Sequence, residues 1–429
     1  MNKSLTKLDY LTIIIFSLIG QVAWTMENMF YNLYIVDEFH AGPDAIALMV
    51  SLSAIFATFT TLFMGALSDK LGRRKIFIVL GYIIWGLIIL SFAFVNSNTI
   101  SNPSLGIALI IILDCLMTFF GSSANDASYN AYLTDISSDE HRGKIEGINS
   151  AMPLIAILIV FGGLSGFAKP GTWNIVFIII SVVVLLCGIL GIFLIKEEKV
   201  EKSNEGYFKN IFYGFRPSVI KQNKTLYIVL IAFAIFSISQ QVFMPYYILY
   251  LRQNIGANAI SNAIGMDGYV VVMAPAIIVA SIFTIFYGKV IDKFGFIKSL
   301  IPTLVIYFVG LIMLTLSKDV IVLFIGCLLM MCGFLSGTAC FNAKIRNHTP
   351  ENKVGLFQGL RLVASVLIPM LIGPWIGSTI CGGGASFGVI ENEETFSVSN
   401  FIFLGAMIVG LFTLLPALFI RRNENEKNK

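Results

Sequence analysis

The chain has few charged residues, few histidines and none of the residue groupings of a soluble enzyme. Charged residues make up 13% of 429 positions, and there are 3 His and 6 Cys, whereas a soluble protein carries about 25% charged residues. No Ser–His pairing, metal-ligand constellation or nucleotide-binding loop occurs. These absences argue against an enzyme, against a cofactor or metal, and against ATP as an energy source.

The scarcity of charge leaves long apolar runs, because 57% of the residues are hydrophobic. A helix crosses a bilayer with about 20 apolar residues, and the first run is too long for a cleavable signal peptide. The composition therefore predicts an all-α, multi-pass protein of the lipid bilayer. The expected helices are 10–36, 44–67, 76–96, 104–134, 142–166, 172–195, 226–251, 266–291, 297–316, 320–346, 354–380 and 399–420.

Basic residues gather on one side of the expected membrane. Of the 29 Lys and Arg, all but Lys169, Arg252, Lys318 and Arg361 fall in the termini and in alternate loops. Cytoplasmic loops carry such an excess, so we expect both termini in the cytoplasm and the protein in the cell membrane. The net charge of +4 is spread over these loops and does not indicate nucleic-acid binding.

Two polar blocks recur after about half the chain. The hinge GALSDKLGRRK at 65–75 returns as GKVIDKFGFIK at 288–298, and the block that starts at Asn130 returns at Asn342. Two ordered blocks at nearly one offset indicate a duplicated architecture. We therefore expect three parts, namely a six-helix bundle over 1–195, a cytoplasmic linker over 196–225 and a second six-helix bundle over 226–429.

The hinge GALSDKLGRRK resembles the G-x-x-x-D-x-x-G-R-R-[KR] signature between the second and third helices of the major facilitator superfamily. The resemblance implies two bundles around a central cavity, related by a pseudo-two-fold axis and lined by their first and fourth helices. It also implies a cytoplasmic gate in which an acidic residue of each hinge contacts the opposite bundle. The expected gating residues are Asp69, Arg73, Arg74, Asp135, Asp292 and Lys293.

Three carboxylates lie inside expected helices, at Glu27, Asp114 and Asp126. A charge at the bilayer centre costs at least ~2.5–3.5 kcal/mol, so such a group has a partner or carries a proton. We assign proton coupling to Glu27 first and then to Asp126 and Asp114. A structural hydrogen bond to a neighbouring helix is the alternative that the sequence leaves open.

The expected cavity helices also carry amide and aromatic side chains. Amides and phenols hydrogen-bond hydroxyl groups, and Trp offers a flat face for a sugar ring, so the set suits a neutral polyhydroxyl ligand. An Arg inside the membrane at 361 requires a carboxylate or a substrate as its partner. The expected substrate-binding residues are Trp24, Asn28, Tyr31, Asn125, Tyr129, Gln240, Gln241, Tyr247 and Arg361.

Longer segments suggest a subgroup. GQVAWTMENMFYNLYI resembles the first helix of sucrose-type proton symporters, and GLFQGLRLVASVLIPMLIGPWIG resembles the glycoside–pentoside–hexuronide cation symporters. The resemblance implies import of a sugar or glycoside with a cation, and we expect a monomer. Helix 44–67 lacks the acidic residues with which the melibiose-carrier branch binds sodium, which favours a proton over sodium.

Proton-coupled efflux of a drug or metabolite is the alternative function. Antiporters of the superfamily carry G-x-x-x-G-P-x-x-G-G in the fifth helix, whereas 142–166 has no Gly-Pro pair. This difference favours import, although GPWIG in the eleventh expected helix supplies such a pair in the other half.

Overall fold

The computed structural model describes residues 5–136, 139–196, 213–255, 267–350, 354–383 and 396–427. Most of the expected linker 196–225 lies outside these residues. Its described end forms a 3-10 turn, η3 (Tyr213–Phe215), and a short helix, α9 (Pro217–Gln222).

Twelve helical stretches are long and apolar enough to span a membrane, which confirms the predicted fold class. In the first half they are α1 (Lys7–Phe39), α2 (Pro43–Leu71), α3 (Lys75–Phe92), α4 (Pro103–Gly121) continued by η1 (Ser122–Tyr129) and α5 (Asn130–Ile136), α6 (Asp139–Leu164) with η2 (Ser165–Phe167), and α7 (Trp173–Leu194). In the second half they are α10 (Lys224–Asn254), α12 (Gly268–Phe294), α13 (Phe296–Leu316), α14 (Val320–His348), α15 (Val354–Leu362) continued by η5 (Val363–Leu367) and α16 (Ile368–Ile380), and α17 (Phe401–Leu411) with α18 (Leu414–Lys427).

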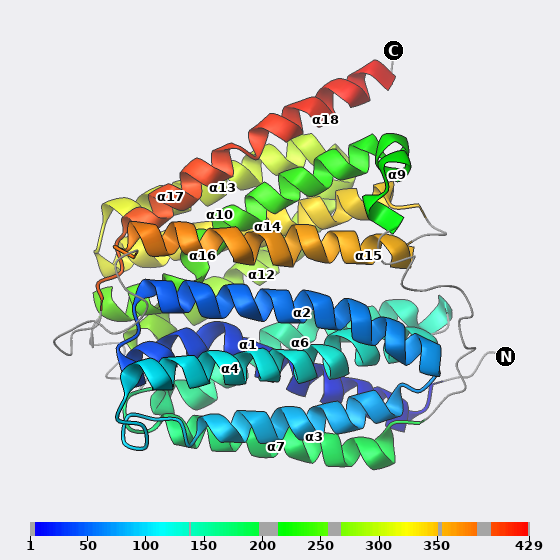
Figure 1. Cartoon of the computed structure of the whole chain (residues 1–429). Coiled ribbons are helices and arrows are strands. Elements are labelled where there is room, and N and C mark those ends of the chain that lie inside the picture. Colours follow the sequence, from blue (N-terminus) through cyan, green and yellow to red (C-terminus); the bar gives the residue numbers. More distant parts are fainter. Residues whose placement is uncertain are drawn as a thin grey trace. The chain divides into compact units, whose positions relative to one another are not determined.

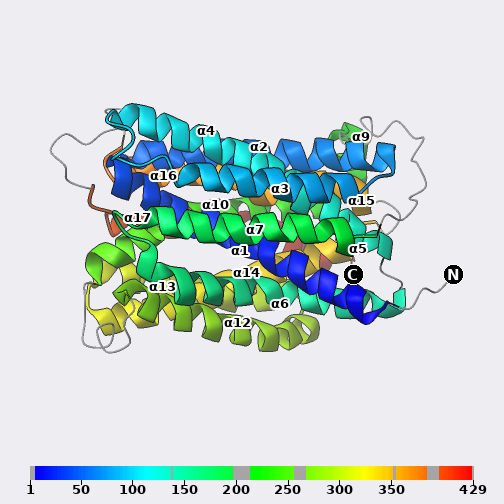
Figure 2. The same cartoon turned by 90° about the horizontal axis from the view of Figure 1, so that it is seen from below.

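The helices group into two compact units. Unit 1 contains Met1–Ala45 and Ile55–Phe208, and unit 2 contains Ile46–Ala54, Lys209–Phe387 and Phe396–Lys429. In unit 1, α3 lies along α7 and α1 along α6 (Figures 1 and 2). In unit 2, α14 packs against α13 and α12, and α10 against α16 and α17.

The repeated hinges occupy corresponding places in the chain, each between one spanning helix and the next. Gly72 caps α2 with φ 63°, and Gly295 follows α12 with φ 76°. A left-handed residue after the last turn ends a helix, and Gly adopts it without a Cβ clash. The repeat therefore encodes a tight reversal between two neighbouring spans.

The Gly-Pro pair of GPWIG lies in a close helix–helix contact in unit 2. A Cβ on Gly373 would overlap Gln241, and a Cβ on Gly377 would overlap the carbonyl oxygen of Val242 and the Tyr246 ring. Helices associate in membranes through small residues that let backbones approach. The two glycines thus bring α16 against α10.

We expect Gly377→Ala to destabilise the protein by about 1–3 kcal/mol, because the added methyl group overfills a packed contact. Gly162→Ala in α6 is the matched control, since a Cβ there meets nothing within 4 Å. Thermal unfolding of the purified variants measures the difference. Equal melting temperatures for the two variants would contradict the assigned packing role.

Candidate functional site

Two carboxyl groups and a hydroxyl meet inside unit 1, where α1 faces α4. Glu27 accepts a hydrogen bond from Thr118 Oγ1 at 3.2 Å, and Asp114, 2% exposed, interacts electrostatically with Glu27. Tyr31 lies close enough to interact with both carboxyl groups, and its hydroxyl donates to Met117 Sδ at 2.8 Å. Three residues singled out in the sequence therefore share one buried cluster.

Asp126 belongs to a second polar group in the same unit. Ser122 Oγ donates to Asp126 Oδ2 at 2.9 Å, and the Trp24 indole lies against the same carboxyl group. The Trp24 ring packs on Trp85 with centroids 5.1 Å apart. A Cβ on Gly121 would come within 3.0 Å of both rings, so the absence of a side chain at 121 makes room for this aromatic pair.

The fourth span changes helical form where its polar residues begin. The sequence predicts one continuous helix over 104–134, but the residues from Ser122 to Tyr129 form the π-helical segment η1. A π-helix replaces i→i+4 hydrogen bonds with i→i+5 bonds and is often found at functional sites. The change alters which side chains point inward after Gly121.

Asn125 and Tyr129, both expected to bind substrate, are hydrogen-bonded within unit 1. Asn125 Nδ2 donates to the Tyr82 hydroxyl at 2.7 Å. The Tyr129 hydroxyl donates to the carbonyl oxygen of Ile13 at 2.9 Å and lies 2.9 Å from Ser17 Oγ. These bonds tie the π-helical segment to α3 and α1.

The other expected substrate residues differ in exposure. Asn28 is exposed and donates to the carbonyl oxygen of Trp24 at 2.7 Å within α1. In unit 2, Gln240 is 7% exposed, and its Nε2 has no hydrogen-bond partner among the described residues. Gln241 is half-buried against Gly373. The fully buried Tyr247 places its hydroxyl beside the Cys327 thiol.

Arg361 has a neutral amide as its partner, where the sequence led us to expect a carboxylate or a substrate. Its Nη2 donates to Asn342 Oδ1 at 3.2 Å. Among the described residues it makes no ion pair, and the nearby Arg346 repels it. An amide oxygen satisfies one donor of a guanidinium that has five, so this Arg retains capacity for an anion.

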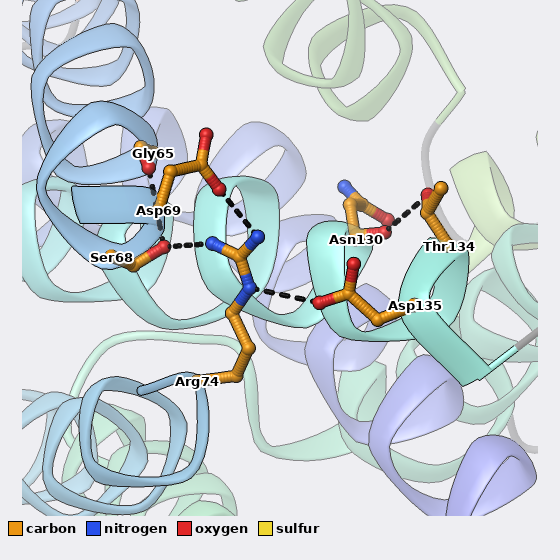
Figure 3. A network of polar contacts seen from close by, with 7 residues as sticks. All are labelled: Gly65, Ser68, Asp69, Arg74, Asn130, Thr134 and Asp135. Carbon is orange, nitrogen blue, oxygen red and sulfur yellow. Dashed lines mark hydrogen bonds and ion pairs between the residues drawn. The ribbon is translucent and has the colours of Figure 1, made fainter. Parts of the chain in front are cut away.

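Arg74 joins the end of α2 to α5 in unit 1 (Figure 3). Its guanidinium pairs with Asp69, donates from Nε to Asp135 Oδ2 at 3.0 Å, and donates to Ser68 Oγ. Burial acts to lower the pKa of Arg74, but the carboxylates of Asp69 and Asp135 outweigh burial and raise this pKa above its usual value. Of the two hinge arginines that could pair with Asp135, Arg74 does so, and Arg73 is exposed.

The second hinge carries no such network among the described residues. Asp292 and Lys293 are exposed at the end of α12, and Lys293 Nζ lies 5.2 Å from the centre of the Phe294 ring. The positions that match Arg74 and Asp135 in the repeat are Ile297 and Asn347. Within the part of the chain that the structure describes, the duplication thus keeps the reversal in both units and the charge network in unit 1 alone.

Sequence reasoning missed the residues that support the candidate groups. Tyr82 and Trp85, three positions apart on α3, form the buried face that contacts Asn125 and Trp24. The i, i+3 spacing of two polar aromatic side chains in a predicted span was the available signal. The spacing of Thr118 does not indicate that it donates to Glu27.

Comparison with known proteins gives a consistent family match. The sequence model of the Major Facilitator Superfamily matches residues 13–374 and 230–429. An uncharacterized MFS-type transporter of Methanocaldococcus jannaschii is 33% identical over 143 residues, 31% of this chain and 33% of the relative. A Na(+), Li(+), K(+)/H(+) antiporter of Planococcus maritimus is 26% identical over 254 residues, 56% of each chain. The chain thus spans about a third of the length of the first relative and just over half of the length of the second.

Solved structures share the fold at low sequence identity. The nucleoside transporter NupG superposes with a TM-score of 0.75 at 12% identity, over 96% of this chain and 100% of NupG. A bacterial homolog of the human lysosomal transporter Spinster, in an inward-facing conformation, gives 0.73 at 13% identity over 98% of both chains. These likenesses establish the architecture and carry no information about the solute.

We expect Arg74→Gln to cost about 1–3 kcal/mol of unfolding free energy, because two partly buried carboxylates lose their charged partner. Arg74→Lys keeps the charge and should retain part of the stability. Arg73→Gln is the matched control and should change stability by less than about 0.5 kcal/mol, since the side chain is exposed.

The effect of Arg74 should not depend on pH in the usual range. Its pKa in the folded protein is raised above its usual value by Asp69 and Asp135, so its stabilisation is present below the unfolded pKa and is lost only as the pH rises through the folded value. Melting temperatures measured from about pH 6 to pH 9 should therefore differ by a constant amount between wild type and Arg74→Gln. A difference of the same size for Arg73→Gln would contradict the assigned network.

Proposed function

The chain belongs to the major facilitator superfamily and is a secondary transporter of small molecules of that type, and on this premise we propose that it couples solute movement to protons. The observation that carries this proposal is the electrostatic interaction in unit 1 between the buried Asp114 and the half-buried Glu27. The proposed solute is a small uncharged sugar or glycoside, and the proposed direction is import.

The carboxyl pair has the properties of a proton carrier. Asp114 is 2% exposed, and its Oδ1 has no hydrogen-bond partner among the described residues. Two like charges close together in a low-dielectric interior are costly, so we propose that the pair shares a proton. We assign the proton-coupling role to Glu27 and Asp114 together, and a supporting role to Asp126.

Protonation of the pair supplies a physical basis for coupling. A ligand or proton shifts a conformational equilibrium only through its differential free energy in the two states. A charged, desolvated pair opposes closure of a site, whereas a protonated pair does not. A proton bound from the side of higher concentration therefore permits the conformational change that carries the solute across.

The proposed solute-binding residues are neutral hydrogen-bonding and aromatic side chains. Gln240 of unit 2 has an amide nitrogen available for a solute hydroxyl, and Trp24 of unit 1 offers a ring face beside Asp126. Asn28, Tyr31, Asn125, Tyr129, Gln241 and Tyr247 complete the proposed set. Asn125 and Tyr129 also hold bonds within unit 1, which fix the orientation of their side chains.

The hinge residues are proposed to act in gating. Arg74 holds Asp69 and Asp135 together at one end of unit 1, and a charge network of this kind is a two-state element when its partners can separate. Arg73, Asp292 and Lys293, which are exposed, are proposed to contribute charge to gating, each within its own unit.

Exchange of a monovalent cation for protons is a second candidate function. The specific observation in its favour is the similarity over 56% of the chain to a Na(+), Li(+), K(+)/H(+) antiporter. The Glu27 and Asp114 oxygens, with Thr118 Oγ1 beside them, also provide the hard ligands that alkali-metal cations prefer.

Proton movements should separate the two candidates. In de-energised cells that express the protein, a transported sugar should make the medium more alkaline, because protons enter with it. In everted vesicles with an imposed pH gradient, Na⁺, Li⁺ or K⁺ salts should leave the gradient unchanged. Cation–proton exchange would be favoured if a cation collapses the gradient and none of sucrose, melibiose, lactose and xylose makes the medium more alkaline.

We expect Asp114→Asn and Glu27→Gln to abolish accumulation driven by a pH gradient while solute exchange persists. One-proton symport gives about tenfold accumulation for each pH unit, and this ratio should fall to about one in the variants. The measurement uses proteoliposomes loaded with the sugar identified above. Asp267→Asn is the matched control, because that side chain makes no capping bond at the start of α12. Full accumulation in Asp114→Asn would refute the coupling assignment.

A further inference from the structure

Unit 2 contains a cavity whose charged lining, among the described residues, is basic. Its volume is about 220 Å³, several times the ~30 Å³ that one water occupies in the liquid. The lining side chains come from α10, α14 and α15 and the residue after α14, so the cavity lies within one unit. They are Leu226, Leu230, Asn342, Ile345, Arg346, Thr349, Phe357 and Arg361.

Two guanidinium groups border this cavity and repel each other. Arg346 lies in the last turn of α14, and Arg361 in the last turn of α15. Asn342 Oδ1 accepts from Arg361 Nη2 at 3.2 Å. No Asp or Glu is among the lining residues, so the described cavity leaves most guanidinium donors available to a ligand.

The remaining lining residues indicate what the non-anionic part of the ligand is made of. Leu226, Leu230 and Phe357 form an apolar wall, and Phe357 is 4% exposed. Thr349 adds a hydroxyl, although its Oγ1 already donates to the carbonyl oxygen of Ile345 at 2.8 Å. One side of the cavity thus suits an anionic head, and the other suits a hydrocarbon or ring.

We propose that this cavity binds a phosphate-bearing anion, with Arg346 and Arg361 on the phosphate oxygens and an organic group on the apolar wall. Guanidinium groups match phosphate oxygens through paired N–H donors. A bound phosphate replaces the repulsion between the two Arg with two attractions, and it links α14 to α15. Both Arg side chains are exposed at the cavity, so the anion has access.

This site is separate from the proposed transport of an uncharged solute. The proposed coupling residues, Glu27 and Asp114, lie in unit 1, whereas the lining residues of the cavity lie in unit 2 and none of them is acidic. The chemistry does not distinguish a soluble phosphate compound from the head group of an anionic phospholipid. Either source would be recognised by the same two guanidinium groups, and the experiment below distinguishes them.

The first test titrates inorganic phosphate into the purified full-length protein in a neutral detergent, with ionic strength held constant by chloride. Wild type should show a saturable rise in melting temperature. Arg346→Gln and Arg361→Gln should weaken the apparent affinity at least about tenfold, and the double variant should keep only the linear rise that phosphate gives any protein. Arg252→Gln, at the far end of α10 and outside the cavity lining, is the matched control and should behave as wild type.

The second test uses wild type alone, so it does not depend on the folding of a variant. Phenylglyoxal modifies accessible Arg, and mass spectrometry of peptides reports modification of Arg346 and Arg361 against Arg252. Protection by inorganic phosphate in phosphatidylcholine nanodiscs identifies a soluble ligand. Protection in phosphatidylglycerol nanodiscs without free phosphate, but not by phosphate in phosphatidylcholine, identifies a lipid head group.

Two results would overturn the proposal. The first is an identical phosphate response in wild type and the double variant, and the second is equal modification of all three Arg in every condition. Neither result would bear on the proton-coupling assignment, because proton-driven accumulation and its loss in Asp114→Asn are measured separately.

Discussion

The cost of placing charge inside spanning helices governs how this protein uses its few ionisable residues. Most Lys and Arg remain in the loops, whereas the interior of unit 1 admits Asp114 and Glu27 only beside neutral donors and each other. Where a buried cation occurs, as at Arg74, two carboxylates and a hydroxyl surround it. The ionisable residues that lie inside the spanning helices are therefore the ones with a functional interpretation.

Close packing positions these groups. Gly121 leaves room for the Trp24–Trp85 pair, and a Cβ on Gly20 would overlap the Asn125 amide. Small residues at such places let polar and aromatic side chains reach across helices that would otherwise stand apart. The same device in unit 2 brings α16 against α10 at Gly377. Packing of glycines and the burial of polar groups thus depend on each other in both units.

Hydropathy and charge distribution were sufficient to predict the twelve spans, because a membrane requires long apolar helices. The hinge spacing was sufficient for the family, but it did not decide which of Arg73 and Arg74 pairs with Asp135. Contacts made across helices were not predictable. Nothing in the spacing of Thr118 indicates that it donates to Glu27, and nothing in Arg361 indicates that Asn342 and Arg346 are its neighbours. Such contacts depend on helix rotation, which periodicity alone does not fix.

Helix rotation has a particular origin in the fourth span. The π-helical segment from Ser122 to Tyr129 has the effect of an extra residue in an α-helix, and each α-helical residue turns the chain by about 100°. Everything after the segment is therefore out of phase with Asp114. Because of this phase shift, the same span points Asp114 inward before the segment and points Asp135 toward Arg74 after it. Treating 103–136 as a uniform α-helix would therefore assign interior and exterior positions incorrectly beyond Gly121.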